Sequence, residues 1–377
     1  MKFYLPGLDG LRGLAFLAVF IGHACYSAGA PIAPAKALGP DNVDWWFRGL
    51  AHAGTFGVDL FFVLSGFLIT RLLLQEEATR GRINIGAFWI RRALRIWPAY
   101  YALLACTLVF NETSRGAIAA LATFTGNLRH SMRPFSLGPV DVGILWSIQI
   151  EEQFYLLWPL MLTVVPRHYR LLLGPVLVAV SIVSRLWLFS GGASLVVWTF
   201  TPARLDGLGV GIVLAFLPLS TAPWFVKRLS LALPVVAVVA AGFTSQALRV
   251  GDPALSIRPE WIMGAVGIPT VIALFCGIVL WAAPSSRWLC WWPLVHLGRI
   301  SYGLYLIHFT VIGWFSSLWW PWSFVLSLAV SVLLAEASYR FLERPFLRLK
   351  ERFTPASEEA SSNAKDAFGI TAAVPHR

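Results

Sequence analysis

The sequence predicts an all-α, polytopic integral membrane protein with about ten transmembrane helices and both termini in the cytoplasm. Its composition points to this class, because 57% of its 377 residues are hydrophobic and only 13% are charged. A soluble domain carries about a quarter charged residues, since a surface facing water needs charge and a surface facing lipid excludes it. The 18 Trp agree, because Trp gathers at membrane–water interfaces.

Ten apolar runs approach the roughly 20 residues that a helix needs to cross the hydrocarbon layer. They lie at 8–28, 56–75, 96–111, 144–165, 171–190, 204–218, 230–248, 261–283, 299–318 and 322–342. A further run, 117–128, is too short to span comfortably. Counting it as a span would turn the basic C-terminal end outward, which the positive-inside rule disfavours. We therefore interpret 117–128 as an interfacial or re-entrant segment.

We expect one transmembrane domain over 1–353 and a disordered cytoplasmic tail over 354–377, where no apolar period survives. Asp9, Arg12 and His23 interrupt the first apolar run, so no cleaved signal peptide is expected. The net charge of +11 is interpreted as topological charge between spans, and no nucleic-acid partner is expected. The 4 Cys show neither pairing nor metal-ligand spacing, so no metal is expected.

Polar residues at membrane depth are costly and therefore indicate function. Arg12 and His23 are eleven residues apart, close to three helical turns, and so share one face of the first span. Arg12 is expected at the cytoplasmic mouth, with His23 about 16 Å deeper. The spacing alone fits a neutral core histidine bonded to a backbone carbonyl as well as it fits a functional group.

Three arginines, Arg91, Arg92 and Arg95, lie within five residues at the cytoplasmic start of the third span. They could be topological anchors. They would also form a cradle for phosphates, because the guanidinium fork binds phosphate oxygens in pairs.

The fourth span places Ser147, Glu151 and Phe154 on one helical face, and the ninth does the same for Ser301, Tyr305 and His308. His308 is expected about 14 Å from the inner end, close to the depth of His23. Because Glu151 is reached from the outer side, we expect His23, His308 and Glu151 to meet in one buried cavity. Asp59 opens the second span near its outer end, and Arg204 with Asp206 opens the sixth as a self-paired charge set.

Taken together, these segments resemble the acyltransferase-3 family, bacterial membrane acyltransferases that acylate sugars and other hydroxyl substrates. The resemblance follows family order along nearly the whole chain. It rests on Arg12 with ten residues before His23, the 57–69 block, Arg92-x-x-Arg95, 147–155, Arg204-Leu205-Asp206, 301–308 and Glu343-Arg344-Pro345. The chain departs from the family at Ile148-Gln149-Ile150, which could alter the cavity wall.

The resemblance implies a multi-pass protein of the bacterial inner (cytoplasmic) membrane that transfers an acyl group from acyl-CoA, most often acetyl-CoA, to a hydroxyl of a carbohydrate or glycolipid acceptor. It implies that the family's catalytic histidine and its arginine partner are His23 and Arg12, that its arginine pair is Arg92 and Arg95, and that its glutamate in the fourth span is Glu151, which we also expect to be catalytic. From their charge and position, Arg12, Arg91, Arg92 and Arg95 are expected to bind the phosphates of the donor. The polar residues expected to bind substrate are Asp59, Ser147, Tyr155, Arg204, Asp206, Ser301, Tyr305 and His308.

We predict that His23 acts as a general base, and an acyl-histidine intermediate is the rival route. Glu151 could orient the imidazole or bind the acceptor. A transporter or flippase with a proton relay is the alternative function, although an arginine pair at the inner mouth suits a phosphorylated donor better. Another membrane O-acyltransferase fold with a buried histidine is a third possibility, which the ordered motifs disfavour. Neither the identity of the acceptor nor any partner protein can be inferred from the sequence.

Overall fold

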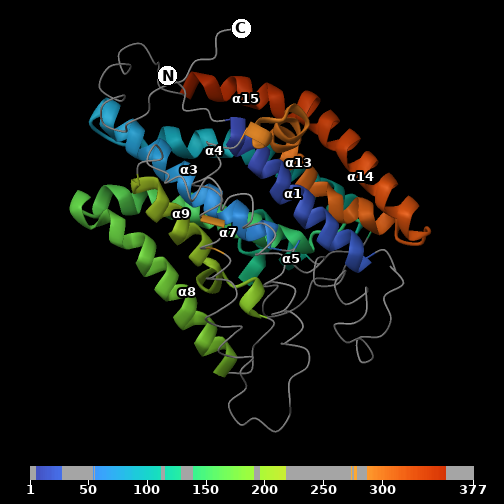
Figure 1. The fold of residues 1–377 in the computed structure, drawn as a ribbon, viewed down its shortest axis with the longest axis horizontal. Helices are drawn as coiled ribbons and strands as arrows, with labels where there is room; N and C mark the ends of the chain where they lie inside the picture. The colour runs from blue at the N-terminus through green and yellow to red at the C-terminus, as the bar shows by residue number, and fades with distance from the viewer. Residues whose placement is uncertain are drawn as a thin grey trace.

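The computed structural model describes residues 6–27, 54, 56–111, 115–128, 139–190, 196–217, 273, 276–277 and 287–353. Every regular element in these ranges is a helix, which confirms the all-α prediction for the described part of the chain (Figure 1). The main helices are α1 (Pro6–Ser27), α3 (Gly57–Arg80), α4 (Ile85–Phe110), α5 (Arg115–Ala122), α7 (Trp146–Val164), α8 (Leu173–Ser190), α9 (Asp206–Phe216), α13 (Trp292–Phe315), α14 (Trp320–Ala337) and α15 (Arg344–Lys350).

Within the described ranges, 5 helices are long and apolar enough to cross a membrane. They span Pro6–Cys25, Gly57–Arg80, Ile85–Phe110, Arg167–Leu188 and Trp320–Phe353. Several of them carry large apolar side chains on their outer surface, among them Val109 at 74% exposure and Phe341 at 81%. Such exposed apolar helices fit a molecule whose outer face meets lipid. The predicted span 230–248 and the predicted tail lie outside the described residues, as does the predicted span 261–283 except for residues 273, 276 and 277.

Helices α1 and α13 pack with their backbones almost in contact (Figure 1). A Cβ atom added at Gly298 would lie 1.7 Å from the carbonyl oxygen of Asp9, and one added at Gly13 would lie 2.3 Å from that of Leu294. Only glycine permits this approach, because real Cβ contacts are longer than about 3 Å. Asp9 lies against Gly298, and further along His23 lies against His308, so the two helices run in the same direction.

Helices α3, α8 and α9 form a second closely packed group. Gly66 of α3 meets the backbone of Leu208, and Gly211 of α9 meets that of Val63. The predicted span 204–218 is shorter than expected, because α9 has only 11 residues. Residues 196–198 and 201–204 before it form separate 3-10 turns.

Helix α4 begins earlier than predicted, at Ile85, where the side chain of Asn84 accepts a hydrogen bond from the Ala87 amide at 3.0 Å and caps the first turn. Arg91, Arg92 and Arg95 therefore lie inside the helix. Tyr100 of α4 accepts a hydrogen bond from Gln149 of α7 at 3.1 Å, and Arg92 lies over the ring of Tyr155, so α4 and α7 run in opposite directions.

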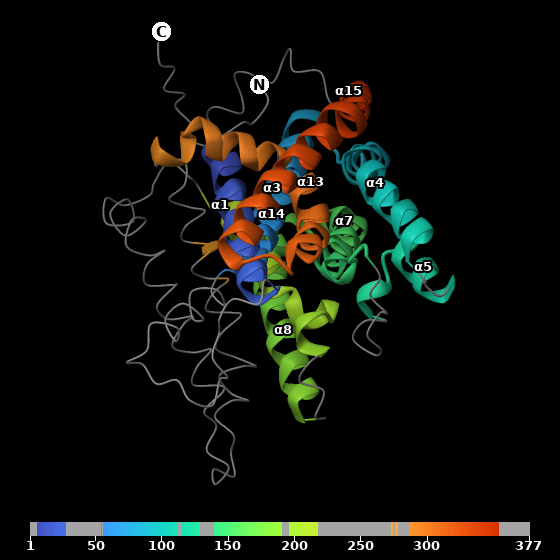
Figure 2. The ribbon, with the colours of Figure 1, turned by 90° about the vertical axis from the view of Figure 1, so that its right-hand side faces the viewer.

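The predicted interfacial or re-entrant segment 117–128 holds most of the 8-residue α5, too short to cross a membrane, and a single further helical turn at 126–128, beside the C-terminal half of α4 (Figure 2). Tyr100 and Tyr101 donate hydrogen bonds of 2.9 Å to the carbonyls of Leu121 and Ala122 at its C-terminal end. The antiparallel run of α4 and α7 agrees with the prediction that this segment is not a span.

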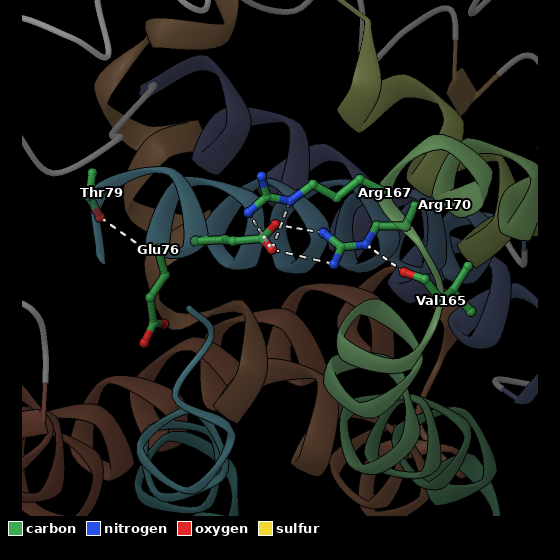
Figure 3. A network of polar contacts seen from close by, with 6 residues as sticks. Glu76, Thr79, Val165, Arg167 and Arg170 are labelled. Atoms are coloured by element: carbon green, nitrogen blue, oxygen red, sulfur yellow. Dashed lines mark hydrogen bonds and ion pairs between the residues drawn. The ribbon is translucent and has the colours of Figure 1, made fainter. Parts of the chain in front are cut away.

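Ion pairs join the helix ends on the side that holds α15. Glu77 of α3 accepts hydrogen bonds from Arg167 at 3.1 Å and from Arg170 at 2.6 Å (Figure 3). Glu76, one residue earlier, pairs with Arg91 at 2.7 Å, and Arg91 also donates to the carbonyl oxygen of Phe353 at 2.9 Å. These contacts tie α3, α4, the 167–172 turn and the C-terminal helical segment together.

Candidate active site

A cavity of about 100 Å³, part of it open to the outside, lies between α1, α3, α4, α7 and α13. Its walls carry three arginines, one carboxylate and a group of hydroxyl side chains. Arg12 comes from α1, Arg92 and Arg95 from α4, Glu151 from α7, and Tyr305 from α13.

The three arginines give one side of the cavity a strong positive charge. Arg12 pairs with Asp9 at 3.4 Å and keeps 30% of its side chain exposed. No described carboxylate lies within ion-pair distance of Arg92 or Arg95. Arg92 instead lies over the rings of Phe88 and Tyr155, at 5.6 and 5.8 Å from their centroids. Guanidinium groups held in this way favour an anionic ligand.

Arg91, which was predicted to bind the donor beside Arg92, does not line this cavity. Its guanidinium is already engaged by Glu76 and by the Phe353 carbonyl. Consecutive residues of a helix point about 100° apart, and here Arg91 points toward Glu76 while Arg92 points into the cavity.

Glu151 is held on the cavity wall by a hydroxyl of the facing helix. Ser65 of α3 donates a hydrogen bond to Glu151 Oε1 at 2.5 Å, and the same Ser65 Oγ lies 3.0 Å from the Tyr155 hydroxyl. Glu151 and Tyr155 are one turn apart on α7 and so share the face that meets α3. Glu152 points elsewhere and accepts a hydrogen bond from the Trp97 indole at 3.0 Å.

A second pair of hydroxyls lines the cavity between α7 and α13. Ser147 Oγ lies 2.7 Å from the Tyr305 hydroxyl, which also donates to the carbonyl oxygen of Ile144 at 3.2 Å. Ser301, one turn before Tyr305, also lines the cavity and donates to the Gly298 carbonyl at 2.8 Å. Ser147, Tyr155, Ser301 and Tyr305, all predicted to bind substrate, therefore lie on the walls of one cavity.

His23 and His308 are in direct contact. His23 Nδ1 lies 2.9 Å from His308 Nε2, and the two ring planes are 15° apart with centroids separated by 5.2 Å. The pair lies behind Tyr305, whose ring centroid is 5.5 Å from that of His308. His308 is fully buried, whereas His23 is partly exposed.

The structure brings together some of the residues predicted to meet and keeps others apart. His23 and His308 pair, but Glu151 contacts Ser65 and faces the arginine-lined cavity, with no contact to either imidazole. Glu151 is therefore not in place to orient the His23 ring directly. The expected meeting of His23, His308 and Glu151 at one point does not occur in the described structure.

Asp59, Arg204 and Asp206 lie beside the cavity, not on its wall. Arg204 pairs with Asp59 at 2.9 Å, and Asp206 pairs with Arg185 of α8 at 2.8 Å, so Arg204 and Asp206 do not pair with each other as the sequence suggested. All four side chains are at most 2% exposed. Arg204 also lies over the rings of Phe62, Trp146 and Trp198.

Two residues of this region were missed by sequence reasoning. Ser65 was interpreted together with Gly66 as a helix-packing pair, but only Gly66 packs against α9, and Ser65, on the next face of α3, lines the cavity. Arg185 was overlooked, although a charged residue inside the predicted span 171–190 is itself a signal of a buried partner.

A model of the acyltransferase-3 family, described as an acyltransferase domain, matches residues 5–337. Among curated proteins, the O-acetyltransferase OatA of Staphylococcus aureus strain NCTC 8325 / PS 47 is 31% identical over 378 residues, covering 91% of this chain and 57% of the relative. OatA of strain COL matches with the same values. No solved structure shows a significant match. The chain thus spans little more than half the length of these relatives.

Proposed function

Because this chain belongs to the acyltransferase-3 family, we propose that it transfers an acyl group, acetyl in the first instance, from acyl-CoA to a hydroxyl of a carbohydrate-containing acceptor at the bacterial inner membrane. The observation that supports this most is the cavity between five helices, which combines three arginines with a carboxylate and several hydroxyls. A phosphorylated donor fits the arginines, and a polyhydroxylated acceptor fits the hydroxyl side chains.

The donor would enter from the cytoplasmic side, because a topology of ten spans with both termini inside would put the cavity arginines at the cytoplasmic mouth. Arg12, Arg92 and Arg95 would bind the CoA phosphates, because guanidinium–phosphate contacts are charge-assisted and often bidentate. Arg167 and Arg170 are already engaged by Glu77 near the C-terminal end of α3 (Figure 3). The cavity arginines are therefore the better candidates for the donor.

The thioester would reach His23 along the face of α1 that carries Arg12 and His23. His23 would remove the proton from the acceptor hydroxyl while the hydroxyl oxygen forms a bond to the acyl carbon. The bond from that carbon to sulfur then breaks, and the proton passes from His23 to the thiolate, giving CoA thiol and an ester. An acyl-histidine on His23 is the rival route, with the same overall balance.

The acceptor would be oriented by Ser147, Tyr155, Ser301 and Tyr305 on the cavity wall. These hydroxyls can donate or accept and so suit a sugar. Glu151, fixed by Ser65, would accept a hydrogen bond from a second hydroxyl of the acceptor. Asp59, Arg204 and Asp206 would support the site from outside its wall, by joining α3 to the 201–204 turn and α9 to Arg185 of α8.

Transfer of radiolabelled acetyl groups in membrane vesicles tests the proposal. Inside-out vesicles containing the wild-type protein should incorporate label from acetyl-CoA into glycan or glycolipid, and sealed right-side-out vesicles should not. Arg95→Ala should abolish incorporation, whereas Arg80→Ala, an exposed arginine at the cytoplasmic end of α3, should leave it unchanged. Equal incorporation with both vesicle orientations, or none with either, would contradict the proposal.

A further inference from the structure

The backbone of α13 determines which nitrogen of His308 carries a proton. His308 Nδ1 lies 2.8 Å from the carbonyl oxygen of Tyr305 and 3.2 Å from that of Leu304, the third and fourth residues before it. A carbonyl oxygen only accepts hydrogen bonds, so Nδ1 of His308 must be the donor. The helix itself thus holds His308 with its proton on Nδ1.

The contact between the two rings then determines the state of His23. A neutral imidazole carries one N–H, so Nε2 of His308 is bare and can only accept. The 2.9 Å contact from His23 Nδ1 to His308 Nε2 therefore requires a proton on Nδ1 of His23. It follows that Nε2 of His23 is bare and free to accept a proton.

The surroundings of the pair favour two neutral rings. His308 is fully buried, with Phe16 edge-on at 5.7 Å, and Phe309 packs against His23 at 4.8 Å. No carboxylate lies within hydrogen-bond distance of either imidazole among the described residues. A charged His308 would donate from both nitrogens and would force the His23 proton onto Nε2, but burial without a counter-charge disfavours that state.

We propose that His308 is a positioning residue, which holds His23 in the tautomer with a bare Nε2 and so prepares it to act as a base. The inference rests on the proposed function, in which His23 takes the acceptor proton. The hydrogen bond between two rings only 15° from parallel fixes the orientation of His23 as well as its tautomer. When His23 becomes charged, the same hydrogen bond to His308 stabilises its Nδ1–H.

Two variants of His308 separate positioning from packing. In His308→Gln the amide can reach the position of Nε2, with its oxygen toward His23 and its nitrogen toward the Tyr305 carbonyl. His308→Leu fills the space without any polar atom. We expect H308L to lower kcat for acetyl transfer by about 10²-fold, the low end of what a general base contributes, with an unchanged KM for acetyl-CoA. H308Q should recover most of kcat. Equal kcat in H308L and wild type, or H308Q as slow as a folded H308L, would overturn the proposal.

Nitrogen-15 NMR of histidine-labelled protein reads the tautomer without any turnover. The signals that disappear in His23→Ala belong to His23. We expect a protonated Nδ1 and a bare Nε2 in wild type and in H308Q, and a mixture of tautomers in H308L. A proton on Nε2 of His23 in wild type would overturn the inference even if H308L does not fold. If the wild-type protein shows this tautomer but transfers no acetyl groups, the tautomer assignment is supported and the proposed function is refuted.

Discussion

Ser65 of α3 donates a hydrogen bond of 2.5 Å to Glu151 of α7, on a cavity wall that also carries Arg12 and Arg92. The contact fixes a carboxylate beside the arginines that we propose to hold the donor phosphates. A carboxylate in this position repels the donor phosphates. It can also accept a hydrogen bond from a hydroxyl of the substrate that receives the acyl group. Donor affinity and turnover should therefore respond in opposite directions when its charge is removed.

Glu151→Gln is expected to bind CoA severalfold more tightly, by about 1 kcal/mol, because one negative charge near the phosphates is lost. The same variant should transfer acetyl groups at least about tenfold more slowly, since an amide is a weaker hydrogen-bond acceptor than a carboxylate. Isothermal titration with CoA and a transfer assay measure the two effects. Glu152→Gln is the matched control, because Glu152 bonds Trp97 away from the cavity wall and should change both values less. Weaker CoA binding by Glu151→Gln would contradict this arrangement.

Arg95→Lys should weaken CoA binding by about tenfold, because lysine keeps the charge but loses the fork that binds phosphate oxygens in pairs. If Arg95 binds the 3′-phosphate, Arg95→Lys should weaken binding less when the ligand is a CoA analogue without that phosphate. Arg91→Lys is the control, since Arg91 is engaged by Glu76 away from the cavity. Titration calorimetry at two salt concentrations makes the comparison. An Arg91→Lys effect as large as that of Arg95→Lys would refute the assignment of the two arginines.

Gly298→Ala should destabilise the protein by at least about 1–3 kcal/mol, the usual cost of overpacking, because its Cβ would lie 1.7 Å from the Asp9 carbonyl oxygen. Activity should fall in parallel, since the same α1–α13 contact brings His23 to His308. Gly313→Ala on the same helix is the control, because a Cβ there meets nothing within 4 Å. Thermal unfolding in detergent compares the two. Equal melting temperatures would show that α1 and α13 do not pack as described.

Arg204→Leu should cost about 3–5 kcal/mol of stability, because it leaves the carboxylate of Asp59 buried without its partner. The double variant Asp59→Leu with Arg204→Leu should be more stable than Arg204→Leu alone, since neither charge then remains unpaired. The fraction of protein that stays soluble in detergent after heating measures both variants. A double variant less stable than the single one would indicate that Asp59 has another partner.

The sequence predicted the helical class and most of the polar residues in the cavity, because charge at membrane depth is rare enough to stand out. It also predicted similar depths for His23 and His308, and the two rings do meet. That agreement follows from α1 and α13 running in the same direction from the same end.

Partnerships between spans were harder to predict. Asp206 follows Arg204 by two residues and was expected to pair with it, but their side chains take different partners, Arg185 and Asp59. Glu151 was placed near His23 from depth alone, although depth does not say which side of a helix faces which cavity. Ser65 was missed because a small residue beside glycine fits helix packing as well as it fits a cavity wall.

The most direct test of the account is release of free CoA from acetyl-CoA by purified protein in nanodiscs, followed with a thiol reagent in the presence of glycan or glycolipid extracts as acceptors. We predict that release requires wild-type His23 and acceptor, and that His23→Ala reduces it to background while CoA binding, measured separately, persists. Release at the wild-type rate by a folded His23→Ala protein would contradict the central claim.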